Sequence, residues 1–297
     1  MALKHGKSVT APRRDFLSVQ EQHQPVLVVV FLRGGADGLT LAPPHGDDAY
    51  HRARPTLAVS RADLHDLDGY IGLNKSMAGL MPLWENGHLA LHHGVGSADE
   101  TRSHFAAQDL MEHGGRIAGG WLARFLRSGS RQIGPLSSVA IGTTMPESLR
   151  GAPGGVVVQS VEEFTVGSDE VQSIGRLRKL YEVAEGPLGE AGRSTLDAIS
   201  RLRRLRSEPG PTAPEPYPDS QLGRGMREIS RLIQAEVGLV ASTIDAVGSG
   251  LGWDTHFIQS QTIGDLMEDL AGSIRSFVAD LGAHADRTRI VVMTEFG

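Results

Sequence analysis

The chain has 297 residues, of which 40% are hydrophobic and 22% are charged, and its net charge is −6. This is the composition of a soluble globular protein with enough apolar material for one large domain or two ordinary ones. The mild acidity and the lack of a face dense in lysine and arginine argue against a nucleic-acid binder. Because cysteine is absent, disulfides, thiolate catalysis and cysteine-ligated metals are excluded, and any metal site must use histidine, carboxylate, hydroxyl or carbonyl ligands.

Residues 1–24 are predicted to form a disordered tail. Arg13 and Arg14, followed by Phe16 and Leu17, resemble a twin-arginine export signal, but the next residues are polar where such a signal has an apolar segment. Two interpretations stay open: a remnant of an export signal, or two ordinary arginines in a tail. In either case we expect this copy not to direct its own export, which favours a cytoplasmic location.

The first half of the chain is predicted to alternate strands with helices. Residues 26–32 are a continuous apolar, β-branched run, which is typical of a strand buried on both faces of a parallel sheet. This is also the longest apolar run, and it is far shorter than the ~20 residues that a transmembrane helix needs. A short helix over residues 76–85, a second strand over 88–95, a helix from His104 onward and strands over 138–142 and 155–159 complete this half.

The second half continues the alternation after a helical region. Residues 171–207 have helical spacing, with Ser194 as a candidate N-cap, and the proline-rich residues 209–218 are an exposed connector, so we expect a helical insertion over about 165–219. A helix over 221–236, a strand over 238–245, a helix over 263–281 and a strand over 289–294 follow. Together these elements predict an α/β domain over 25–297 with a largely parallel sheet.

Chemistry-bearing residues follow three of these strands. Asp37 lies in a glycine-rich turn, Asp254 and His256 lie in a Gly-Trp-Asp-Thr-His turn, and Glu295 follows the last strand. Because the carboxyl ends of parallel strands lie together, these turns are predicted to converge in one crevice. Carboxylates with an imidazole suit a divalent ion such as zinc, manganese, magnesium or calcium.

A fourth segment, Thr101-Arg102-Ser103-His104, opens a helix. A hydroxyl in this position lies where backbone N–H groups favour an anion, and a metal, a hydroxyl and an anion cradle are the minimal set for phosphoryl or sulfuryl transfer. Each element also has a simpler interpretation: the glycine-rich turn as only a turn, and Thr101 and Ser103 as helix caps. His92 and His93 would point to opposite faces of their strand, so at most one could join a site.

Several motifs in order resemble the domain-of-unknown-function 1501 family, from about Pro25 to the end of the chain. They are VVVFLRGGADGL at 28–39, RPTLAV at 54–59, TRSHFAAQ at 101–108, GWDTH at 252–256 and VVMTEFG at 291–297. That family is similar to a sulfatase-like branch of the alkaline phosphatase superfamily. The resemblance implies a three-layer sandwich with a metal site at the strand ends, and export through the twin-arginine route to the periplasm or outside.

The resemblance also implies roles for individual residues. Asp37 matches the metal aspartate of the first strand, Asp254 and His256 match an Asp/His ligand pair, and Glu295 matches a further acidic ligand. Ser103, with Thr101 as second choice, falls where the superfamily has its nucleophile. Glu295-Phe296 replaces a common Asp-His pair, the approach to Gly-Trp-Asp-Thr-His over 246–251 is longer than usual, and an expected Asp-His-Gly segment is missing, so we expect a copy truncated at its C-terminus.

Two functional hypotheses result. The first is a metal-dependent hydrolase of phosphate or sulfate esters, in which zinc, manganese or calcium is bound, Ser103 attacks, and Arg102 or His104 helps to hold the oxyanion; its substrate would be a small-molecule or glycan ester. The alternative is a non-catalytic or degenerate sulfatase-like domain that binds a metal, a glycan or a partner protein. A purely structural fragment is a third possibility.

Overall fold

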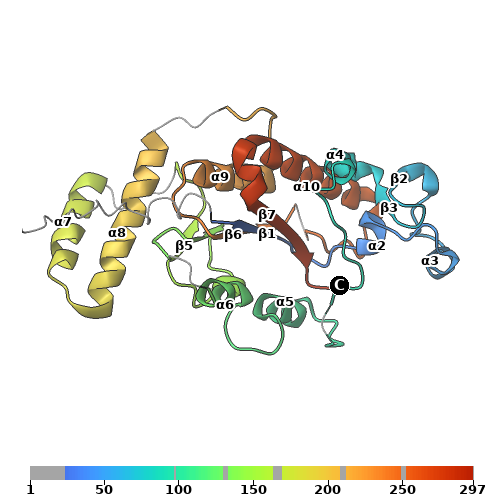
Figure 1. The fold of residues 1–297 in the computed structure, drawn as a ribbon. Helices are drawn as coiled ribbons and strands as arrows, with labels where there is room; N and C mark the ends of the chain where they lie inside the picture. Colours follow the sequence, from blue (N-terminus) through green and yellow to red (C-terminus); the bar gives the residue numbers. More distant parts are fainter. Residues whose placement is uncertain are drawn as a thin grey trace, which may run out of the picture.

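The computed structural model describes residues 24–96, 98–129, 133–162, 169–207, 212–248 and 252–296. Its centre is a sheet of five parallel strands in the order β5-β4-β6-β1-β7 (Figure 1). The strands are β1 (Val26–Leu32), β4 (Ser138–Ile141), β5 (Gly155–Val158), β6 (Ala241–Ala246) and β7 (Thr288–Thr294). The predicted α/β class with a largely parallel sheet is therefore confirmed.

Strand β1 lies in the interior of this sheet because its apolar run can be buried on both faces. Val28 and Val30 contribute to the core formed with helices α9 (Gln221–Gln234) and α10 (Gln259–Leu281), and Val29 packs on the opposite face with α6 (Trp121–Arg127). Figure 1 shows these helices on either side of the sheet, with α5 (His104–His113) beside α6. Burial of one valine side chain contributes roughly 1.5 kcal/mol or more, so β1 is a major source of stability and positions the turn that follows it.

Most predicted elements are present within one to four residues of their expected limits. The helices and strands expected over 221–236, 263–281, 138–142, 155–159 and 289–294 correspond to α9, α10, β4, β5 and β7. The strand expected over 238–245 starts later, at Ala241. The short helix expected over 76–85 is a 3₁₀ segment, Lys75–Leu80, followed by α4 (Met81–Glu85).

The strand predicted over residues 88–95 is wrong. These residues connect α4 to α5 without forming a strand in the described part of the chain, and His92 and His93 are exposed. Leu89 packs against the main core from this connection. The apolar residues here therefore reflect the local packing of Leu89 against the core, and none of the described strands pairs with this segment.

Residues 171–207 are helical as predicted, as two helices, α7 (Glu170–Glu182) and α8 (Gly186–Ser207). They pack on each other through Ile174, Leu196 and Ile199 and form a hairpin that projects from the sheet in Figure 1. Ser194 lies inside α8, so its prediction as an N-cap is wrong. The cap of α7 is Asp169, whose side chain accepts a hydrogen bond from the Gln172 backbone N–H.

Smaller elements complete the fold around the C-terminal ends of the strands. They are α2 (Gly38–Leu41), α3 (Asp48–Ala53) and the antiparallel pair β2 (Leu64–Asp66) and β3 (Gly72–Asn74), none of which the sequence predicted. In the regions described, no helix combines the length and the hydrophobicity required to cross a bilayer. The predicted tail and its twin-arginine motif lie outside the described residues, apart from Gln24.

Candidate metal centre

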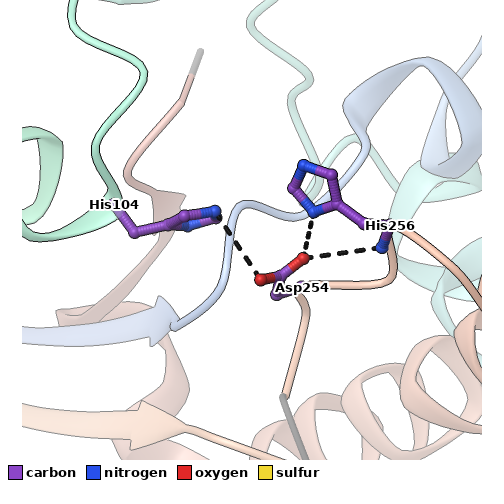
Figure 2. Close-up of side chains that lie close together, drawn as sticks. All are labelled: His104, Asp254 and His256. Carbon is purple, nitrogen blue, oxygen red and sulfur yellow. Dashed lines mark hydrogen bonds and ion pairs between the residues drawn. The ribbon is translucent and has the colours of Figure 1, made fainter.

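Three side chains from distant parts of the sequence meet at the carboxyl end of the sheet. His104 comes from the first turn of α5, and Asp254 and His256 come from the loop that follows β6 (Figure 2). One ligand atom from each of the three lies within 4.8 Å of the other two. This edge of a parallel sheet is where ligand sites form in open α/β folds, and the predicted turns with Asp254 and with Glu295 both reach His104 there.

The turn after β1 allows the Asp254 loop to approach closely. Gly34 has a φ of +120°, and a Cβ added there would lie 2.3 Å from the backbone nitrogen of Asp254. The backbone N–H of Trp253 donates to the carbonyl of Arg33 at 2.9 Å. The glycine is therefore required at this position, because only a residue without a side chain leaves room for the neighbouring backbone.

Glu295 lies behind His104 as a buried carboxylate. Its Oε1 accepts hydrogen bonds from the Gly34 backbone N–H at 2.8 Å, from His104 Nδ1 at 3.0 Å and from Gln108 Nε2 at 3.0 Å. Burial alone would raise the pKa of Glu295, but the hydrogen bonds from Gln108, His104 and the backbone outweigh it and lower that pKa. Glu295 is thus held ionised as a fixed acceptor.

This contact sets the orientation of the His104 ring. A carboxylate can only accept, so His104 Nδ1 is the donor in this contact, and Nε2 is the nitrogen left free to bind an ion. Nε2 faces Asp254 Oδ2 at 3.7 Å (Figure 2). A histidine oriented by a carboxylate through its other nitrogen is the usual arrangement of a metal-ligating imidazole.

Asp254 and His256 form the more accessible side of the cluster. His256 Nδ1 contacts Asp254 Oδ1, and its side chain is 65% exposed, whereas that of Asp254 is 27% exposed. The hydrogen bond from His256 is the main cause that lowers the pKa of Asp254. Together with His104 from α5, this loop offers two nitrogen donors and one oxygen donor on a solvent-accessible surface.

The donor set fits a divalent ion with an open coordination position. Two histidines and one carboxylate bind catalytic zinc at ~2.0–2.2 Å and leave a fourth position for water or substrate. The ligand atoms already lie close enough together to reach one ion after small side-chain rotations. Imidazole ligands favour zinc, whereas manganese is more typical of oxygen-rich sites and calcium prefers six to eight oxygen ligands.

Asp37 lies outside this cluster. Its Oδ1 accepts from Arg54 Nη1 at 2.8 Å, and its Oδ2 accepts from Thr40 Oγ1 at 2.7 Å and from Gln259 Nε2 at 2.5 Å. Burial would raise the pKa of Asp37, but the hydrogen bonds from Arg54, Thr40 and Gln259 and the charge of Arg54 lower it. As folded here, both carboxylate oxygens are engaged and a cation already neutralises the group.

Replacing Asp37 by asparagine is expected to lower the free energy of unfolding by about 2 kcal/mol at neutral pH, because a partly buried charge-assisted contact is lost. The folded-state pKa is depressed, so the contribution is complete above the unfolded pKa of ~3.9 and disappears as the pH falls through the folded value. Urea titrations of wild type and Asp37→Asn between pH 2.5 and 7 measure this. Exposed Asp197→Asn in α8 is the control; a difference that persists undiminished at the lowest pH contradicts the assignment.

The predicted nucleophile segment is at the N-terminus of α5. Ser103 is the N-cap, and its Oγ accepts from the Ala106 backbone N–H at 3.5 Å, while Thr101 Oγ1 accepts from the Ser103 N–H at 3.2 Å. Ser103 and Arg102 are exposed. Both hydroxyls thus have a local capping role, and Ser103 directly precedes the candidate ligand His104.

Sequence reasoning missed Gln108, Arg33 and Glu112. Gln108 and Glu112 follow His104 at intervals of four residues, which places all three side chains on one face of α5. Gln108 donates to Glu295, and Glu112 accepts from Arg33 Nη1 at 3.1 Å. The four-residue spacing of polar side chains on a helix against the sheet was the available signal.

Comparison with known proteins adds one finding. The model of a family described as "Protein of unknown function (DUF1501)" matches residues 157–297. This supports the resemblance to that family over the part that carries Asp254, His256 and Glu295. No curated protein and no solved structure matches the chain.

Proposed function

We propose that this protein is a metal-dependent hydrolase of phosphate or sulfate esters with an alkaline-phosphatase-like arrangement. The observation that carries the proposal is the orientation of His104 by the buried Glu295, with Nε2 facing Asp254. A histidine held by a buried carboxylate through one ring nitrogen, beside a second histidine and a carboxylate, is the donor arrangement typical of a metal-binding site. The position at the carboxyl ends of β1 and β7 supports the same reading.

His104, Asp254 and His256 would hold the ion, and Glu295 would hold His104. A divalent ion bound there supplies a Lewis acid toward a phosphoryl or sulfuryl oxygen. Of the three ions expected from the sequence, zinc therefore comes first, manganese second and calcium last. The family resemblance implies that Asp37 is a metal ligand. We propose instead that it stabilises the fold through its ion pair with Arg54.

The N-terminus of α5 would position the ester group. Backbone N–H groups at a helix N-terminus favour an anion, and Arg102 adds a cation beside Ser103. In the proposed reaction, Ser103 Oγ forms a bond to phosphorus or sulfur, the bond to the alcohol oxygen breaks, and the alcohol leaves with a proton. Water then cleaves the serine ester, which restores the serine hydroxyl and releases phosphate or sulfate.

A non-catalytic metal-binding domain is the second candidate. One observation favours it: the Ser103 hydroxyl is a helix cap, and the described residues give it no hydrogen bond to a general base. A nucleophilic serine normally has such a base or a metal to remove its proton. The two candidates share the metal site and differ in the role of Ser103.

Replacing Ser103 separates these candidates. Ser103→Ala removes both the cap and the nucleophile and is expected to cost ~1 kcal/mol of stability, whereas Ser103→Asn keeps a good cap without the hydroxyl. If Ser103 is the nucleophile, both variants lose turnover of 4-nitrophenyl phosphate or sulfate at least 1000-fold while retaining bound metal. Full activity in Ser103→Asn would contradict the nucleophile, and absence of any ester hydrolysis by metal-loaded wild type would favour the binding domain.

A further inference from the structure

A second polar site lies beside the candidate metal centre, at the carboxyl ends of β4 and β6. It is a cavity of about 320 Å³, which is at the lower end of the volumes of small-molecule sites. Its lining includes Arg33, Glu112, Asp245 and the loop after β4 with Thr143 and Thr144. The edge of the sheet that carries the metal centre thus continues into a cavity that the proposed chemistry does not use.

Part of the cavity lining is a network in which an arginine is paired with two carboxylates. Arg33 Nη1 lies 3.1 Å from Glu112 and Nη2 lies 3.0 Å from Asp245 Oδ1, and the guanidinium stacks on Phe31 at 4.1 Å from the ring centroid. The Asp245 side chain keeps 38% of its surface exposed. Burial, together with the carboxylates of Glu112 and Glu295, raises the pKa of Asp245 against the opposing effect of Arg33. The cation is therefore already satisfied by two carboxylates.

The charges in the cavity lining indicate the charge of the ligand that it can bind. An anionic group entering the cavity would meet Asp245, Glu112 and Glu147, and the guanidinium of Arg33 in the lining is already paired. Glu147 in turn pairs with Arg150 at 2.8 Å, so the three carboxylates and two guanidinium groups leave at most one net negative charge. Exposed Thr143, Thr144 and Gln221 add hydroxyl and amide groups that both donate and accept. A neutral ligand with many hydroxyl groups matches this lining.

The cavity and the metal centre are linked by one face of α5. His104 faces the metal centre, Gln108 follows four residues later, and Glu112 borders the cavity. At 1.5 Å per residue, His104 and Glu112 are ~12 Å apart along the helix axis. Because Glu112 is buried and Gln108 donates to the buried Glu295, this face packs against the sheet, and ~12 Å is the span that the alcohol part of an ester at His104 would have to cover to reach the cavity.

We propose that this cavity binds the alcohol part of the substrate, and that this part is a neutral sugar. The inference rests on the proposed hydrolase function for its place in the reaction. The binding of the sugar itself requires no metal and no turnover, so the two can be tested apart.

The test is saturation-transfer NMR with metal-free protein and the methyl glycosides of glucose, galactose and mannose. We expect at least one glycoside to bind wild type and to bind the Thr143→Val, Thr144→Val double variant about tenfold more weakly, since two hydroxyl contacts are lost. Thr212→Val, at an exposed threonine in the connector before α9, is the control and is expected to bind as wild type does.

Two results would overturn the inference: no binding of any of the three glycosides to folded wild type, or equal binding by the double variant. Either result leaves the metal-dependent hydrolase untouched, because metal content and hydrolysis of 4-nitrophenyl esters are measured independently. Conversely, sugar binding that depends on Thr143 and Thr144 in a chain that takes up no metal supports the cavity and overturns the proposed function.

Discussion

Replacing Gly34 by alanine is expected to destabilise the fold by roughly 2–5 kcal/mol, the sum of overpacking and a positive φ that L-residues disfavour. The added Cβ would lie 2.3 Å from the backbone nitrogen of Asp254 and 2.8 Å from that of Trp253. Relief of this clash requires the Asp254 loop to move away from β1, which separates Asp254 and His256 from His104. Metal binding is therefore expected to be lost even at temperatures where the variant remains folded.

Gly38→Ala is the matched control for this prediction, because a Cβ at Gly38 has no atom within 4 Å. Thermal unfolding and metal titration of the two variants and wild type make the comparison. A Gly34→Ala variant that unfolds and binds metal as the Gly38→Ala variant does would contradict the close approach of the two loops.

Replacing Glu295 by glutamine is expected to weaken metal binding by about 10–100-fold, the usual effect of losing a carboxylate that supports a ligating histidine. The amide keeps the shape of the side chain but not its charge, so Nδ1 of His104 loses its ionised acceptor at 3.0 Å. Isothermal titration with zinc and with manganese measures the change. The fold should persist, because the amide oxygen can still accept from the Gly34 N–H.

Glu182→Gln, an exposed carboxylate in α7, controls for the change in net charge. Unchanged affinity in Glu295→Gln would mean that Glu295 does not act through His104. An affinity lost completely, beyond 1000-fold, would instead favour Glu295 as a direct ligand, as the family resemblance implies.

Much of the fold follows from local pattern. The seven apolar residues of β1 are buried only if helices pack on both faces of the sheet. The amphipathic helices α9 and α10 pack on one of these faces. The strand expected over residues 88–95 shows the limit of this reasoning, since a short apolar run does not specify a partner strand. The prediction of Ser194 as an N-cap failed for a similar reason. A serine inside a helix such as α8 cannot be told from one before a helix by the local sequence alone.

The sequence allowed most of the candidate site residues to be predicted, but not which of them lie in contact. The turns with Asp254, His256 and Glu295 follow strands of one parallel sheet, so their convergence could be expected from topology. His104 as the third candidate ligand depends on how α5 meets β7, which no local pattern encodes. The ion pair between Asp37 and Arg54 depends on how the end of α3 packs against the turn after β1. The sequence shows an aspartate in a glycine-rich turn but not the arginine that pairs with it.

The most direct test of this account is the metal content of the purified chain after reconstitution, beside a His104→Ala, Asp254→Asn double variant and Asp37→Asn. The account predicts one zinc or manganese ion per chain in wild type and in Asp37→Asn, and none in the double variant. The same metal content in the double variant as in wild type, or loss of metal in Asp37→Asn with the fold intact, would contradict the proposed centre.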